Sequence, residues 1–109
     1  MVDRDVRKAE NESLFRDVNE RVEDTAIRWG TSEGRIAFLC ECADLECTDR
    51  VELTVPEYER VRAEPAHFVI FPGHADPAFE VVTATFPGFE VVAKLGEAAA
   101  RAEADDPRA

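Results

Sequence analysis

The sequence predicts an α+β fold with an N-terminal amphipathic helix, a small, mainly antiparallel sheet, a short middle helix and a C-terminal helix. Two observations lead to this prediction. Apolar residues recur every three or four positions near the start of the chain, as they do in an amphipathic helix. Further on, short β-prone runs are separated by proline and glycine turns. A chain of 109 residues is long enough for one hydrophobic core and too short for two.

We therefore expect a single domain over residues 1–109. Its parts are a helix over residues 1–30, an α+β core over 35–95, a C-terminal helix over 97–104 and a frayed tail over 105–109. No apolar run reaches the roughly 20 residues that cross a bilayer, and the first residues do not resemble a signal peptide. These features predict a cytoplasmic protein that does not enter a membrane.

The first helix, expected over residues 3–29, carries its apolar residues on one stripe. These are Val6, Leu14, Phe15, Val18, Val22, Ala26, Ile27 and Trp29. On the polar face, three acids each precede an arginine by four residues, the favourable order for helical ion pairs. The pairs are Glu12 with Arg16, Asp17 with Arg21, and Asp24 with Arg28. The apolar stripe can pack on its own domain or bind a protein partner or a second copy, and Trp29 can serve either arrangement.

A β-hairpin that carries the cysteines should follow. Gly30 can end the first helix in the left-handed conformation, so residues 30–34 are expected to form a connector. Two strands are expected over residues 36–40 and 50–54, the second with alternating apolar and charged side chains. The three cysteines lie between these two strands.

The second half of the chain alternates helical and strand signals. Thr54 and Glu57 can form a capping box for a helix over residues 56–63. Three strands are then expected, over residues 67–71, 80–86 and 89–94. The last two flank Pro87-Gly88, which suits the central positions of a type II turn. Their nearly continuous apolar character predicts that helices cover them, with Phe71, Phe79, Phe86 and Phe89 in the core.

The charge of the chain excludes some classes of partner. The sequence has 24 acidic and 13 basic residues, which give a formal net charge of −11. Such a field repels polyanions, so neither nucleic acid nor an anionic membrane surface is an expected partner. The mixture of 45% hydrophobic and 34% charged residues is typical of a folded domain and excludes a disordered chain.

All three cysteines lie within eight residues, as Cys40, Cys42 and Cys47. An odd number in one cluster argues against a disulfide framework and favours a metal or redox site. On a strand, residues two apart point the same way, so Cys40 and Cys42 can face one point while Glu41 faces outward. A turn over residues 43–46 can return Cys47 to that point. Three converging thiolates repel one another, which raises their pKa values unless a cation binds them.

A tetrahedral site needs a fourth ligand, and the sequence offers two histidines. His74 lies in the turn Pro72-Gly73-His74, where proline and glycine fix the backbone at the end of a strand. His67, at the start of that strand, is the alternative, and a ligand of another type or water also remains open. Soft sulfur ligands in a tetrahedral set favour zinc or an iron–sulfur centre over magnesium or calcium. We predict a metal site of Cys40, Cys42, Cys47 and His74.

The residues around this site resemble a known group of proteins. The resemblance rests on the segments Phe38-Leu39-Cys40-Glu41-Cys42-Ala43-Asp44, Cys47-Thr48, Val51-Glu52-Leu53-Thr54, Glu57-Tyr58-Glu59, Val61-Arg62, Phe68-Val69 and Pro72-Gly73-His74. From about Asn11 to Arg108, the chain is similar to a family of small uncharacterised proteins of high-GC bacteria. The resemblance implies that three cysteines and one histidine belong together as a unit, and it implies no particular activity.

Three functions fit this set of ligands. A structural zinc site would close the coordination sphere, and the protein would act as an interaction or adaptor module. Alternatively, the same cysteines could form a thiol-based redox or metal-responsive switch, or hold an iron–sulfur cluster. Acidic neighbours such as Glu41, Asp44 and Glu46 argue against reactive thiolates, because negative charge raises the pKa of a thiol. The sequence contains no recognisable catalytic constellation, so a non-enzymatic role is favoured and no catalytic residue is predicted.

Overall fold

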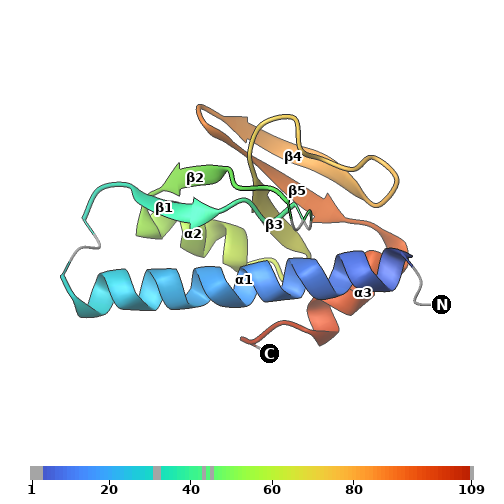
Figure 1. The fold of residues 1–109 in the computed structure, drawn as a ribbon, viewed down its shortest axis with the longest axis horizontal. Coiled ribbons are helices and arrows are strands. Elements are labelled where there is room, and N and C mark those ends of the chain that lie inside the picture. Colours follow the sequence, from blue (N-terminus) through green and yellow to red (C-terminus); the bar gives the residue numbers. More distant parts are fainter. Residues whose placement is uncertain (1–3, 31–32, 43, 45, 109) are drawn as a thin grey trace.

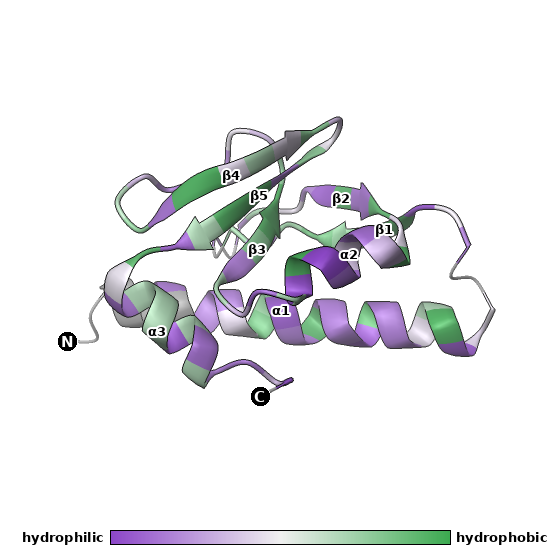
Figure 2. Cartoon of the chain, turned by 180° about the vertical axis from the view of Figure 1, so that it is seen from behind, coloured by the Kyte–Doolittle hydropathy of each residue, from purple (hydrophilic) through white to green (hydrophobic). Residues whose placement is uncertain are grey.

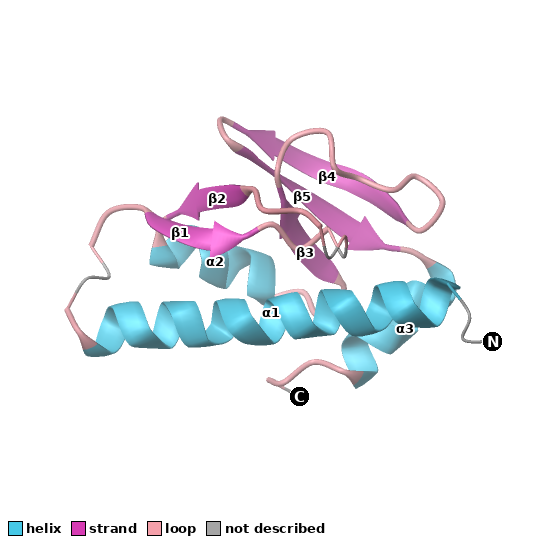
Figure 3. Cartoon of the chain, viewed as in Figure 1, coloured by secondary structure: helices cyan, strands magenta, loops and turns pink. Residues whose placement is uncertain are grey.

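The computed structural model describes residues 4–30, 33–42, 44 and 46–108, which form three helices and two small antiparallel sheets (Figure 1 and Figure 3). The helices are α1 (Arg4–Arg28), α2 (Val55–Arg62) and α3 (Gly96–Ala104). The strands are β1 (Ile36–Leu39), β2 (Arg50–Leu53), β3 (His67–Ile70), β4 (Glu80–Phe86) and β5 (Phe89–Lys94). The predicted α+β class is confirmed, although the expected single sheet is divided into two. Among the described residues, no helix has the length and apolar character needed to cross a bilayer.

The two sheets meet at the cysteine loop. β1 pairs with β2, and β5 lies between β3 and β4, with antiparallel pairing throughout. Helix α1 runs along the bottom of the view in Figure 1, beneath both sheets. Directly after β1, the Glu41 N–H donates to the Val69 carbonyl of β3 over 2.8 Å, and the Cys40 N–H donates to the Asp49 carbonyl. The chain therefore passes from the first sheet to the second where the cysteines begin.

Several local sequence signals are confirmed by the structure. Gly30 ends α1 with a φ of 71°, in the left-handed region. Thr54 and Glu57 form the predicted capping box at the start of α2. Phe86 pairs with Phe89 across a two-residue turn, in which Gly88 takes a φ of 88°, as the second central position of a type II turn requires.

The apolar core consists of two clusters on opposite faces of the second sheet. The first lies between that sheet, the β1–β2 pair and α2, and contains Phe38, Val51, Leu53, Tyr58, Val61, Val69, Phe89 and Val91. The second contains Cys40, Phe68, Ile70, Val92 and Ala102. Cys42 and Cys47 pack against the second cluster, so the cysteine site lies at the edge of a core.

The buried face of α1 is polar, contrary to the prediction from its apolar stripe. It consists of four polar residues, Glu12, Arg16, Asn19 and Glu23, and of Ala26. Glu12 pairs with Lys94 of β5 over 2.8 Å, and Arg16 donates to the carbonyls of Pro65 and Ala102. Burial raises the pKa of Glu12 and lowers that of Arg16. These two residues therefore bind the rest of the domain instead of forming the predicted surface pair, whereas Asp24 and Arg28 do pair on the surface over 3.1 Å.

The apolar stripe of α1 is only partly covered. Val22 packs against the first core cluster, but the exposed fractions of Leu14, Ile27 and Trp29 are 53%, 52% and 75%. Trp29 is thus on the surface and not in the core. The side chain of Val6 lies outside the described part of the chain. In Figure 2, α1 alternates purple and green turns, whereas much of β4 and β5 is green.

Two further expectations are wrong. Val81, Val82 and Phe86 of β4 are exposed, because β4 is the edge strand while α2 packs on β3 and α3 packs on β5. Phe71 is exposed as well, and of the four phenylalanines expected in the core only Phe89 is fully buried.

The C-terminal tail is also not frayed. Asp106 is buried and accepts from the Arg62 guanidinium over 2.6 Å, and Arg108 contacts Glu20 and Glu59. The tail is held by charged partners that lie far away in the sequence, whereas residue 109 lies outside the described part.

Candidate metal centre

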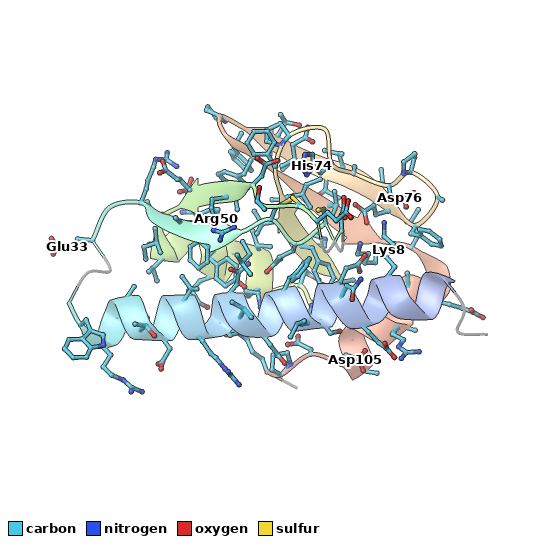
Figure 4. All side chains as sticks on the ribbon, viewed as in Figure 1. Lys8, Glu33, Arg50, His74, Asp76 and Asp105 are labelled. Carbon is cyan, nitrogen blue, oxygen red and sulfur yellow. The ribbon has the colours of Figure 1, made fainter. Side chains whose placement is uncertain are left out.

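Three separate segments bring four metal-binding side chains together. Cys40 and Cys42 follow β1, and Cys47 precedes β2. His74, which is labelled in Figure 4, lies in the turn after β3. One ligand atom from each residue lies within 4.8 Å of the other three. The structure therefore brings the three cysteines and His74, the histidine predicted as the fourth ligand, into one group that can hold a metal ion.

The two sulfur–nitrogen distances of the group fit a tetrahedral ion. The Nδ1 atom of His74 lies 3.5 Å from the Cys40 sulfur and 3.6 Å from the Cys47 sulfur. Zinc binds sulfur at about 2.3 Å and nitrogen at about 2.0–2.1 Å, so tetrahedral angles place these two ligand atoms about 3.5 Å apart. Two of the six distances between ligand atoms thus already match such an ion, and all four atoms lie within 4.8 Å of one another.

The histidine at the other end of β3 does not belong to this group. His67 is paired with Ala93 of β5, on a position whose side chain points away from the face of Phe68 and Ile70. That face carries the core cluster against which the cysteines pack. His67, the alternative fourth ligand, is therefore on the wrong side of the sheet.

The expected alternation of Cys40, Glu41 and Cys42 holds, but its orientation relative to the solvent was predicted wrongly. Glu41 has an exposed fraction of 0%. Its carboxylate accepts from the Val69 N–H and the Asn19 side chain, each over 2.9 Å, and from the Tyr58 hydroxyl over 3.2 Å. The side opposite the cysteines is the interior between α1 and α2, so a residue that points away from the sulfurs points into the protein.

Glu41 stabilises the cysteine segment from the side opposite the sulfurs. Burial raises the pKa of its carboxyl group, while the hydrogen bonds from Asn19 and Val69 favour the charged form. Asn19 also accepts from the Leu39 N–H over 2.7 Å and donates to the Leu39 carbonyl over 3.0 Å, at the end of β1. The backbone on both sides of Cys40 is thereby fixed to α1 and β3.

Backbone groups also contact the cysteine sulfurs. The Phe71 N–H donates to the Cys40 sulfur over 3.1 Å, and backbone hydrogen bonds from Asp44 and Asp49 favour the thiolates of Cys42 and Cys47. Such donors reduce the negative charge that three converging thiolates bring to one point. Turn positions 43 and 45 lie outside the described residues.

The pKa values of the metal-free thiols are strongly divided. The pKa of Cys42 falls to about 5, chiefly because the Cys40 thiol donates a hydrogen bond to it. The same hydrogen bond, together with burial, raises the pKa of Cys40, and burial raises that of Cys47. The expected upward shift is confirmed for Cys40 and Cys47 and is wrong for Cys42. Without an ion, the thiolate form is favoured at Cys42 and disfavoured at Cys40 and Cys47.

The second nitrogen of His74 has a partner that sequence reasoning missed. The Asp49 carboxylate lies 3.4 Å from His74 Nε2, opposite the Nδ1 atom that faces the sulfurs. A carboxylate behind a ligand histidine is a common arrangement in zinc sites, because it holds the ring and selects the tautomer. The only available signal was an acid two residues after Cys47. Phe71 lies beside the imidazole, with ring centroids 5.3 Å apart.

Fold and site together define a small α+β domain with a three-cysteine, one-histidine cluster that can hold a metal ion. Comparison with protein-family models, curated proteins and solved structures gives no significant match. The resemblance to small proteins of high-GC bacteria stays a prediction. The functional argument consequently depends on the geometry of the site.

Proposed function

We propose that this chain is a small interaction module whose fold is held by a structural zinc ion bound to Cys40, Cys42, Cys47 and His74. The observation that carries the proposal is the match between the sulfur–nitrogen distances and the edge of a zinc tetrahedron. Three thiolates and one imidazole are a donor set that zinc prefers and that magnesium and calcium do not.

Four protein ligands support a structural role for the ion. Catalytic zinc sites keep one position for water or substrate, whereas structural sites have four ligands from the protein. Here the ligands join the loop between β1 and β2 to the turn between β3 and β4. The ion would connect the two sheets at the cysteine loop, whose described residues belong to no helix or strand.

Metal analysis tests this proposal directly. We expect about one zinc ion per chain in protein purified without oxygen, and the same content in the control variant His67→Ala. His74→Ala should lose or weaken binding, because it removes the only nitrogen ligand of the group. Absence of metal from the wild-type protein would overturn the proposal, and so would iron together with visible absorbance, which indicates an iron–sulfur centre.

The metal should also contribute to the stability of the fold. Cys42→Ser is expected to unfold the domain or to lower its melting temperature sharply, and a zinc chelator should do the same to the wild-type protein. Circular dichroism during heating measures both effects. An unchanged melting temperature after complete metal removal would contradict a structural role.

A redox or metal-responsive switch is the second candidate, and the closeness of the cysteine side chains to one another favours it. A thiolate at neutral pH is the form that reacts with peroxide, and Cys40 lies within hydrogen-bond distance as a possible disulfide partner. Zinc release at peroxide concentrations that preserve the fold, with reversal by a reductant, would favour this function. Release only on unfolding would contradict it.

A further inference from the structure

Helix α1 contacts the segment that carries the first two cysteines. In this cysteine segment, residues 39–42, the Leu39 carbonyl accepts from the Asn19 side chain over 3.0 Å, and the Glu41 carboxylate accepts from it over 2.9 Å. The Leu39 N–H donates in return to the Asn19 side chain over 2.7 Å. Because Leu39 and Glu41 lie on either side of Cys40, one side chain of α1 fixes the backbone around this ligand.

The same helix contacts the turn that carries the histidine ligand. The Lys8 ammonium lies 2.8 Å from the carboxylate of Asp76, two residues after His74, and the two paired side chains are only 18% and 26% exposed. Figure 4 labels these three residues, with Lys8 next to Asp76. The other oxygen of Asp76 accepts from the Ala78 N–H over 3.1 Å, which orients the carboxylate. Lys8 thus binds the histidine turn, residues 71–76, to the first part of α1.

A buried charge network adds a second connection between α1 and the histidine turn. Glu12 pairs with Lys94 over 2.8 Å, and Lys94 also pairs with Glu80. The second oxygen of Glu80 accepts from the Asp76 N–H over 3.2 Å. All three members of the network are buried. Residues 8–19 of α1 are therefore connected to both metal-binding segments.

Residues 20–28 of α1 are bound elsewhere. Glu20 pairs with Arg62 of α2 over 2.5 Å. Arg108 of the C-terminal tail contacts both Glu20 and Glu23. These partners belong to neither the cysteine segment nor the histidine turn. The two parts of one helix thus have different anchors.

We propose that residues 8–19 of α1 position the two halves of the metal centre, so that zinc binding and the docking of this part of the helix stabilise each other. This inference rests on the proposed function and adds a regulation of the same site. A helix is stiff, and its rise of about 1.5 Å per residue sets Lys8 and Asn19 about 16 Å apart along the axis. Both side chains reach their partners together only when the cysteine segment and the histidine turn are held at a matching separation. An ion bound to both segments fixes that separation, and because such coupling is reciprocal, the docked helix in turn strengthens zinc binding.

Substitution of Lys8 tests the effect of the helix on the metal. Lys8→Met removes the ammonium but keeps a long aliphatic side chain, and it should weaken zinc binding about fivefold, at the lower end of typical coupling between sites. Lys8→Arg retains the charge and should recover most of this loss. Arg28→Met removes a cation from an exposed ion pair of the same helix and is the matched control, which should leave the affinity unchanged. A competition titration against a chromophoric chelator measures all three variants.

Hydrogen exchange tests the effect of the metal on the helix. Backbone amides are followed in zinc-loaded wild-type protein at several free zinc concentrations, all above saturation. If residues 8–19 open only when zinc leaves, their exchange should slow about tenfold for each tenfold rise in free zinc, by mass action. The amides of residues 20–28, which have anchors of their own, should change little. An equal zinc dependence in both parts of the helix, or none in either, would contradict the coupling.

Zinc content, measured in every sample, separates this inference from the proposed function. A chain that binds no zinc would overturn both. A chain that binds about one zinc ion, with the same affinity in Lys8→Met as in Arg28→Met, would overturn the coupling alone.

Discussion

At the scale of single residues, the site depends on the residues that contact the ligands as much as on the ligands themselves. His74 has sulfur on the side of Nδ1 and the Asp49 carboxylate on the side of Nε2. A carboxylate that accepts from Nε2–H leaves Nδ1 without a proton and able to bind a metal. Asp49 is in this sense a positioning residue for His74.

We therefore predict that Asp49→Asn weakens zinc binding about 10- to 100-fold, the range observed when such outer partners are removed. A competition titration against a chromophoric chelator measures this effect. Asp44→Asn, at another exposed acid of the same loop, is the control and should change the affinity much less. Loss of Asp49 should also shift the ¹⁵N resonances of His74 toward the other tautomer. If Asp49 has only a structural role, its loss should leave these resonances unchanged.

The sequence was sufficient to choose the four clustered residues but not their supports. Spacing along a strand placed Cys40 and Cys42 on one side, and a proline–glycine turn exposed His74. Spacing cannot show which side of a strand faces the interior, and for that reason Glu41 was predicted on the wrong side. Its partners Asn19 and Tyr58 come from α1 and α2, and only tertiary packing brings them to it.

At the scale of elements, α1 shows how an apolar pattern can mislead. Its most buried positions are charged or amidic. Each of these side chains contacts a specific partner, which compensates the free-energy cost of burying it. The tail after α3 follows the same rule: Asp106 and Arg108 bind carboxylate and guanidinium groups on α1 and α2. Local sequence contains no sign of these long-range pairs.

The tail should therefore contribute to stability through one residue in particular. Asp106→Ala should lower the free energy of unfolding by about 3 kcal/mol, because it leaves the fully buried Arg62 side chain with Glu20 as its remaining partner. Asp105→Ala removes an exposed pair with Arg101 at 3.5 Å and should cost less than about 1 kcal/mol. Urea denaturation of both variants provides the measurement. Equal losses would show that the tail is not anchored through Arg62.

At the scale of the whole molecule, acidic groups converge where α1, α2 and the tail meet. Glu23 lies beside Glu59, and burial together with a hydrogen bond to Glu59 raises the pKa of Glu23 to about 7. The Arg108 side chain contacts both, and its hydrogen bond lowers the pKa of Glu59. The folded protein thus retains a proton on Glu23 that the unfolded chain releases near pH 4.5.

This difference predicts a loss of stability with rising pH. Because the folded state binds the extra proton, the contribution of Glu23 is present below about pH 4.5 and is lost as the pH rises to about 7. Glu23→Gln keeps a hydrogen-bond donor for Glu59 and carries no charge at any of these pH values. Between pH 5 and pH 7.5, its free energy of unfolding should therefore rise relative to that of the wild type by on the order of 1 to 3 kcal/mol. Urea unfolding at several pH values tests this. The exposed control Glu97→Gln should follow the wild-type profile, and a parallel profile for Glu23→Gln would contradict the assignment.

The overall class of the fold was predictable because its local signals agree with one another. Caps, turns and strand runs were found at their predicted places, among them the Thr54 capping box and the Gly88 turn. The division into two sheets was not predictable, because strand pairing depends on which segments meet in space. The exposure of β4 has the same origin: an apolar strand at an edge has the same sequence as one at the centre.

The buried carboxylate between the two cysteines has a consequence for recognising relatives of this chain. The residue between Cys40 and Cys42 is bound by an asparagine 22 residues before it and a tyrosine 17 residues after it. An apolar residue in place of Glu41 would leave the Asn19 amide and the Tyr58 hydroxyl without this buried partner. We therefore expect a chain that shares this fold and site to carry residues equivalent to Asn19, Glu41 and Tyr58 together with the cysteines.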